Sequence, residues 1–291
     1  MVDVEKGYSL RRQFSRREQK AEVIKEIVDL IDDAIFIGGI AYIAHMLDVI
    51  KDPKKLRYQK DIDFFTKDRD KAIKILEARG YDKRSEPIIE GVEITDKYAK
   101  YDTQRRKIVG RIKLKIPEEK KDGTLIYEVP VGVGVDIISR NYYSGSFPNP
   151  EYAIESLIKN STEKNFFGDK IVVQGVDDLL AMKLLNMERA YKGKEKIIYN
   201  RDAYDVLNIV NYLENKIDVN QLKELVGSKD VLKERLEKIV EEVYRPGSEV
   251  DETLAKLIQA QEIESLDANI YLSIGYKEDE LNKLCELIQR L

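Results

Sequence analysis

The chain has 291 residues, of which 43 % are hydrophobic and 36 % charged, so it can bury a core in one large or two medium domains. Its 50 basic and 54 acidic residues nearly balance, which excludes a strongly basic nucleic-acid-binding protein and leaves any RNA contact to a local basic patch. One cysteine excludes an internal disulfide and one histidine excludes a Cys/His zinc site; without a secretory signal or an apolar run of about 18 residues, we expect a cytoplasmic protein with no membrane span.

An apolar strand that ends in two glycines dominates the first part of the chain. A helix is predicted over 14–33, and the apolar strand follows over 34–37. Gly38 and Gly39 then break the strand before a second helix, predicted over 41–50. A strand, a glycine turn and a helix start bring backbone N–H groups and the positive end of a helix dipole to one point, which is typical of an anion site. Two glycines alone are weak evidence for such a site, since their usual place is an ordinary tight turn.

Two aspartates alternate in the next predicted strand, which covers 61–65. Because side chains alternate between the faces of a strand, Asp61 and Asp63 point the same way and Ile62 points into the protein. The two carboxylates repel each other and resist losing water, and a divalent cation such as Mg²⁺ or Mn²⁺ removes both penalties. The alternative is an edge strand with a solvated acidic face. Combined with the glycine turn, the pattern fits a metal-dependent nucleotidyl transfer.

The middle of the chain is rich in predicted strands. A helix over 69–79 ends at Gly80, and the strands cover 92–101, 107–116, 124–129 and the residues around Asp136. Lys113 and Lys115 alternate with apolar residues, so one face of their strand is basic. That face either contacts a nucleotide or RNA, or protects an exposed strand edge.

After a loop over 140–150, helices are predicted to dominate. The helix over 177–189 is amphipathic and carries Lys183 on its polar side. In the helix over 202–212, Asp202 and Asp205 share a face, although Asp202 could simply be the N-terminal cap.

Several short motifs follow one another in a recognisable order. They are Gly38-Gly39, then Arg57 four residues before Asp61-Ile62-Asp63, then Asp136 after an apolar run, then Asp177-x5-Lys183, and Arg201-Asp202-x-x-Asp205. In this order they resemble the minimal nucleotidyltransferases of the polymerase-beta-like superfamily, in particular the AbiEii/AbiGii toxin-type proteins. The resemblance covers roughly residues 30 to 215. The chain departs from it at Gln59, where the family usually has Ser or Thr, and at Ile40, where many members have Ser.

The resemblance implies an α+β fold with two domains. Residues 1–145 would form a polymerase-beta-like catalytic domain with a mixed sheet flanked by helices, and residues 146–291 a mainly helical domain that contributes the Lys and Asp motifs. It also implies a role for each motif residue. Asp61, Asp63 and Asp136 would hold Mg²⁺ or Mn²⁺; Lys183 would neutralise charge on the phosphoryl group, oriented by Asp205 or Asp202; Gly38, Gly39, Arg57 and Asp202 would bind the nucleotide.

Three functions compete at this stage. The first is transfer of a nucleoside monophosphate from an NTP to an acceptor, which the resemblance suggests is an RNA end such as tRNA or a protein hydroxyl, in a toxin with an antitoxin partner. The second is a non-catalytic nucleotide-binding or toxin–antitoxin partner protein on the same fold, favoured by Gln59 and Ile40. The third is a sugar-nucleotide transferase, which would leave Asp136 unexplained.

Overall fold

A computed structural model describes residues 20–50, 61–83, 96–101, 107–110, 125–128, 132–192, 196–242 and 278–290. The predictions for Arg57, Gln59, Lys113 and Lys115 fall outside these residues.

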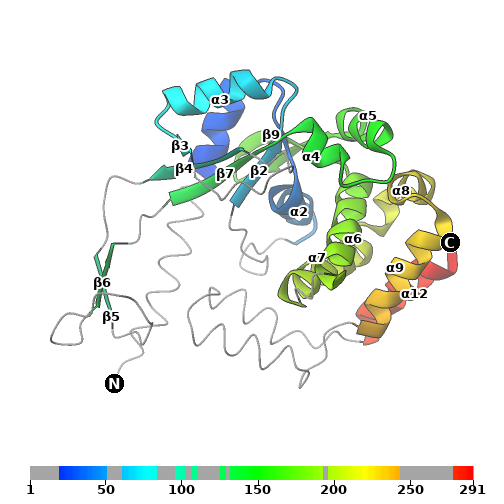
Figure 1. Cartoon of the computed structure of the whole chain (residues 1–291). Coiled ribbons are helices and arrows are strands. Elements are labelled where there is room, and N and C mark those ends of the chain that lie inside the picture. Colours follow the sequence, from blue (N-terminus) through cyan, green and yellow to red (C-terminus); the bar gives the residue numbers. More distant parts are fainter. Residues whose placement is uncertain are drawn as a thin grey trace.

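A seven-stranded mixed sheet forms the centre of the structure (Figure 1). Its order is β3-β4-β7-β2-β1-β9-β8, in which β2 runs parallel to β7 and β1 runs parallel to β9. The strands are β1 (Ile35–Phe36), β2 (Asp61–Phe65), β3 (Asp82–Lys83), β4 (Asp96–Tyr101), β7 (Gly132–Ile138), β8 (Thr162–Phe166) and β9 (Asp169–Val173). A separate hairpin pairs β5 (Lys107–Gly110) with β6 (Leu125–Glu128).

Helices cover both faces of the sheet. The helix over 20–30 and α3 (Arg69–Ala78) lie on one face, and α2 (Gly38–Leu47) lies on the other (Figure 1). Asp68 caps α3 by accepting a hydrogen bond from the Lys71 backbone N–H at 3.0 Å, and Gly80 ends it with φ 78°. The predicted end of this helix is therefore confirmed.

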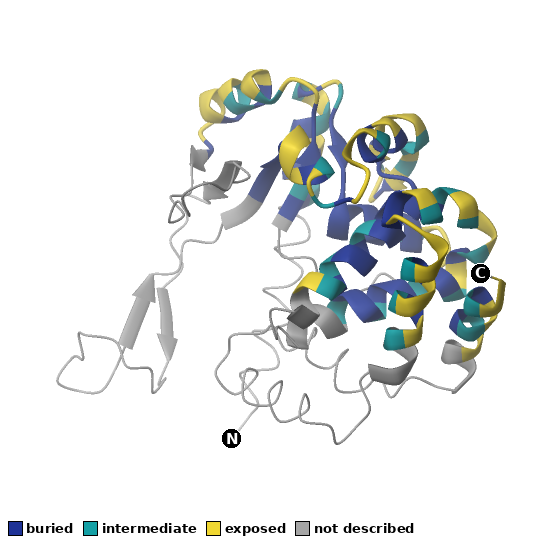
Figure 2. Cartoon of the chain, turned by 45° about the vertical axis from the view of Figure 1, so that its right-hand side comes forward, coloured by how far each residue is buried: buried dark blue, intermediate teal, exposed yellow. Residues whose placement is uncertain are grey.

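The second half of the chain is mainly helical. Its helices are α4 (Arg140–Ser144), α5 (Pro150–Asn160), α6 (Val176–Lys192), α7 (Lys196–Leu213), the short η2 (Glu214–Lys216), α8 (Val219–Val226), α9 (Lys229–Glu242) and α12 (Glu278–Arg290). Most of the described part of α6 is buried (Figure 2). In the parts of the chain that the structure describes, no helix has the length and apolar character needed to cross a membrane.

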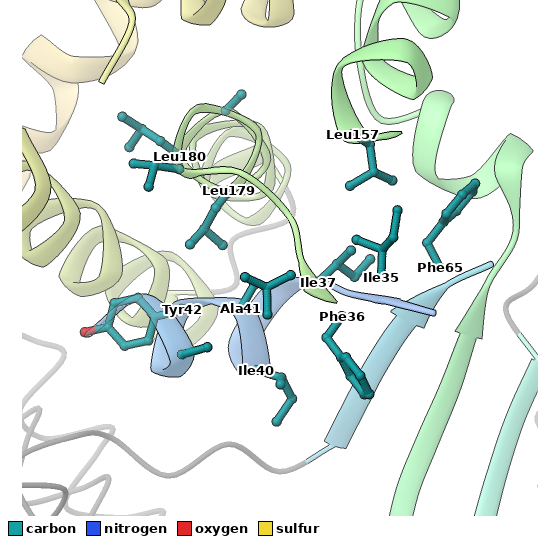
Figure 3. Close-up of a cluster of buried hydrophobic side chains, with 14 of the residues drawn as sticks. Ile35, Phe36, Ile37, Ile40, Ala41, Tyr42, Phe65, Leu157, Leu179 and Leu180 are labelled. Carbon is teal, nitrogen blue, oxygen red and sulfur yellow. The ribbon is translucent and has the colours of Figure 1, made fainter. Parts of the chain in front are cut away.

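The hydrophobic core lies on both faces of the sheet because side chains alternate between the two faces along each strand. Ile62 pairs with Val135 and Phe64 with Ile137, and all four side chains are fully buried on the face toward α3. On the opposite face, residues of β1 and α2 pack against Leu157 of α5 and against Leu179 and Leu180 of α6 (Figure 3). Burial of these apolar side chains fixes α2 and α6 against the sheet.

The α+β fold class is confirmed, but two helix boundaries differ from the sequence predictions and two strands were not predicted. The helix predicted over 41–50 begins at Gly38, so both glycines lie in its first turn. The helix predicted to begin at Asp202 begins at Lys196. Two unpredicted strands, β8 and β9, follow residue 145 and join the same sheet as the strands before it.

Candidate functional site

Two aspartates lie side by side on adjacent parallel strands. Asp63 of β2 is the register partner of Asp136 of β7, so their carboxylates project from the same face of the sheet. Asp136 is 9 % exposed and Asp63 is partly exposed. Asp61 is the first residue of β2 and pairs with Gly134, but the position of its side chain is not described.

The first turn of α2 meets these carboxylates. Gly38 adopts φ 60°, and a Cβ atom added there would lie 3.3 Å from Asp63 Oδ2 and 3.8 Å from Met182 Cε. Glycine is needed for both the left-handed backbone and the close approach. The first turn of α2 contains no acidic residue. No carboxylate within that turn therefore offsets the positive end of the helix dipole. Ile40, in the same turn, is 1 % exposed.

Gln174, at the end of β9, connects the sheet to α2 by three hydrogen bonds. Its backbone N–H donates to the Phe36 carbonyl at 3.0 Å. Its side-chain Oε1 accepts from the Gly38 backbone N–H at 2.6 Å. Its backbone carbonyl accepts from Nε2 of His45 at 2.9 Å. Burial lowers the pKa of His45 to about 4, so the imidazole is neutral near pH 7 and Nε2 carries the proton that it donates.

A buried lysine and two buried aspartates join α6 to α7. Lys183 Nζ lies 2.8 Å from Asp202 Oδ1 and 2.8 Å from Asp205 Oδ2. Lys183 is 3 % exposed and both aspartates are fully buried. Lys183, which the sequence places on the polar side of its helix, is buried because the carboxylates of Asp202 and Asp205 provide a polar environment for it inside the protein. Asp202 is not an N-terminal cap, since α7 begins six residues earlier, at Lys196.

Two adjacent aspartates begin α6 and have raised pKa values. Burial raises the pKa of Asp177 to about 7 and that of Asp178 to about 7. Asp177 Oδ1 accepts a hydrogen bond from the Asp218 backbone N–H at 2.9 Å, which opposes the shift. A carboxyl with a higher pKa in the folded than in the unfolded protein holds its proton more tightly when folded. Its contribution to stability is complete below the unfolded pKa of about 4 and is lost as the pH rises through 7.

The comparison with protein families agrees with this geometry. The family model described as "Nucleotidyl transferase AbiEii toxin, Type IV TA system" matches residues 26–276. The chain belongs to the AbiEii nucleotidyl transferase toxin family. A search of curated proteins finds no match. The suspected family is thus confirmed over most of the chain, and the family is one of nucleotidyl transferases that act as toxins of a toxin–antitoxin system.

The carboxylate oxygens of Asp63 and Asp136 in this AbiEii chain are ligands of the type that hard divalent cations prefer. Asp63 and Asp136 are two carboxylates at paired positions of the sheet, and a divalent cation between them would reduce their mutual repulsion. Within the described side chains, no group of three or more His, Cys, Asp or Glu residues comes together as a metal site. The side chain of Asp61, the third predicted ligand, is not among those searched.

The structure therefore brings the predicted residues of the AbiEii chain into two groups. Gly38, Asp63 and Asp136 form the first, and Lys183, Asp202 and Asp205 form the second. Met182 lies next to Gly38 of the first group and directly precedes Lys183 of the second, so α6 runs past both groups.

The sequence did not indicate a role for two residues that lie next to the first group, Gln174 and Met182. Gln174 is a single polar residue between a strand and a helix, and Met182 reads as an ordinary apolar position of α6. The only local signal for Gln174 is its place directly after the apolar run Ile171–Val173.

Proposed function

We propose that this AbiEii chain is a metal-dependent nucleotidyltransferase that moves a nucleoside monophosphate from an NTP to an acceptor. The observation that carries the proposal is the pairing of Asp63 with Asp136 on adjacent parallel strands, directly in front of the N-terminus of α2. Carboxylates beside a helix N-terminus provide metal ligands and phosphate-binding N–H groups at one point.

Asp61, Asp63 and Asp136 would hold Mg²⁺ or Mn²⁺. When bound, such ions activate the hydroxyl of the acceptor and neutralise the charge of the leaving pyrophosphate. The oxygen-only donor set and the unfavourable pairing of two carboxylates support this assignment.

The remaining motif residues would bind and orient the nucleotide. The first turn of α2, at Gly38 and Gly39, would let the backbone approach the phosphates, with the Gly38 N–H itself held by Gln174 Oε1. Arg57 would pair with a phosphate or with a neighbouring carboxylate. Lys183, oriented by Asp202 and Asp205, would supply positive charge as the phosphoryl group is transferred. Asp136 would take the proton of the acceptor hydroxyl.

The acceptor would be an RNA end such as that of tRNA, or a protein hydroxyl. The family description names a toxin–antitoxin system, which supports an antitoxin partner, and we expect the toxin to act in the cytoplasm. Neither assignment depends on a contact of the described residues, so both require a direct test.

The test is an incubation of the protein with each α-³²P-labelled NTP, Mg²⁺ or Mn²⁺ and total tRNA. Label transfer should be at least about 100-fold slower in Asp63→Asn and in Asp136→Asn than in the wild-type protein, because each variant loses a negative charge that would bind the metal. Both variants should still unfold cooperatively on heating, which would show that the loss of transfer comes from the site and not from loss of the fold. Asp169→Asn, on the same sheet at the start of β9, is the matched control and should transfer label normally.

Metal-dependent NTP binding without transfer of label would instead support the non-catalytic nucleotide-binding protein. Ile40 is the observation that favours this second function, because a buried isoleucine in the first turn of α2 offers no hydroxyl to a phosphate. Absence of both binding and transfer would refute the proposed metal site.

A further inference from the structure

The first turn of α2 lacks a cap of its own. Ile37 occupies the N-cap position and makes no side-chain hydrogen bond to the helix, and its backbone N–H donates to the Asp63 carbonyl at 3.0 Å. The N–H groups of a first helical turn have no acceptor within the helix, so they must find one elsewhere. For Gly38 that acceptor is the Gln174 side chain, at 2.6 Å.

Gln174 holds α2 at both ends. Its side chain fixes the first turn through Gly38, and its backbone carbonyl fixes the last turn through His45. The Gln174 backbone N–H is itself fixed by Phe36 of the adjacent strand β1. Gln174 is fully buried, so these bonds are shielded from water. The left-handed conformation of Gly38 therefore depends on a residue 136 positions away.

The other end of the Gln174 amide is unusual. Its Nε2 atom is buried and has no hydrogen-bond partner among the residues that the structure describes. A buried donor without an acceptor is unfavourable, and such groups in native proteins call for a specific explanation. Nε2 is bonded to the same carbon as Oε1, the atom that accepts the hydrogen bond from the Gly38 N–H. An anion bound at this turn would therefore lie near a buried donor that lacks an acceptor.

We propose that Gln174 is a positioning residue for nucleotide binding, which holds Gly38 in place so that the first turn of α2 stays open to the phosphates of the NTP. The inference rests on the proposed function and adds to it a residue outside the motifs. It predicts that loss of the Gln174 side chain weakens binding of an NTP more than binding of an NMP, because the NTP carries more phosphates. A purely structural role would change the binding of every nucleotide alike.

The experiment measures equilibrium binding of an NTP and of the matching NMP, with Mg²⁺, to the wild-type protein and to two variants. Gln174→Met keeps the length of the side chain and removes the acceptor. Gln174→Asn keeps the amide but is too short to reach Gly38, and it remains informative if the first variant folds poorly. In each variant, we expect Kd for the NTP to rise about 3- to 10-fold, the range for loss of one neutral hydrogen bond, and Kd for the NMP to change less than about 2-fold.

Gln221→Met is the matched control, because it also removes a partly buried amide, one that donates to Ser156 Oγ at 3.0 Å on α5. It should leave both Kd values unchanged. An equal rise of both Kd values in the Gln174 variants, or no rise in either, would overturn the inference while the proposed function stands. A wild-type protein that binds no NTP would overturn the proposed function and this inference together.

Discussion

Replacing Lys183 with methionine tests whether its positive charge serves catalysis or only holds α6 against α7. The substitution keeps the length of the side chain but removes the cation that lies between the buried carboxylates of Asp202 and Asp205, while Arg201 Nε stays 3.3 Å from Asp202 Oδ1. At an effective dielectric constant near 20, each contact at 2.8 Å corresponds to roughly 6 kcal/mol of Coulomb attraction, most of which offsets desolvation. Breaking such a buried pair typically destabilises a protein by about 3–5 kcal/mol.

Thermal unfolding and label transfer, measured on the same variants, separate the two roles. Lys183→Met should lower the unfolding temperature by roughly 6–20 °C, from about 2–4 °C for each kcal/mol in a chain of this size. The triple variant Lys183→Met/Asp202→Asn/Asp205→Asn removes all three charges, and most of the lost stability should return. If the lysine acts on the phosphoryl group, transfer by the triple variant should still be at least about 100-fold below that of the wild-type protein.

Recovery of transfer in the triple variant would refute this reasoning, because a folded protein without the lysine would then be sufficient. Lys238→Met provides the matched control. Lys238 pairs with Glu234 at 2.7 Å on the surface of α9, where both side chains are exposed. Its loss should change the unfolding free energy by no more than about 0.5 kcal/mol and should leave transfer unchanged.

Three further predictions follow from the same structure. Asp178→Asn removes a carboxyl with a raised pKa. From pH 4 to pH 8, the free energy of unfolding of the variant in urea should therefore rise by about 1–4 kcal/mol relative to that of the wild-type protein. The same difference between the two proteins at both pH values would contradict the raised pKa. Gly38→Ala should lower stability by about 1–2 kcal/mol and abolish NTP binding, whereas Gly80→Ala, with a similar φ of 78° but nothing within 4 Å, should lower stability alone. Tyr42→Phe should cost about 1 kcal/mol in thermal unfolding, because it removes the hydroxyl that accepts a hydrogen bond from Asn208 at 3.1 Å, and no loss would show that this bond does not hold α2 to α7.

The sequence was informative wherever the pattern is local. Alternation along 61–65 is enough to separate the buried Ile62 and Phe64 from Asp63, since the period of a strand is fixed at two residues. The apolar run before Asp136 likewise predicts a strand, and the register between β2 and β7 then brings the two aspartates together.

Features that depend on distant partners could not be predicted in this way. Lys183 reads as a surface residue because its two carboxylates come from another helix, and nothing in the local pattern shows that they surround it. Strand β8 was missed because it lies at the edge of the sheet, where its alternate residues face water and its sequence, Thr162–Phe166, is mostly polar. At the early start of α2, the Gly38 N–H donates a hydrogen bond to Gln174 Oε1, which no property of two glycines predicts.

Charge balance links the two groups of residues to nucleotide binding. The first group contains Asp63 and Asp136, and in the second group Lys183 and Arg201 pair with Asp202 and Asp205. An NTP adds further negative charge, and the dipole of α2 supplies only about half a positive charge to offset it. Under the proposed function, attraction for the nucleotide would therefore come from metal ions held by the aspartates and from Arg57. We infer that metal and nucleotide bind as a unit, and that Lys183, already neutralised by its own carboxylates, contributes by its fixed position rather than by drawing the nucleotide into the site.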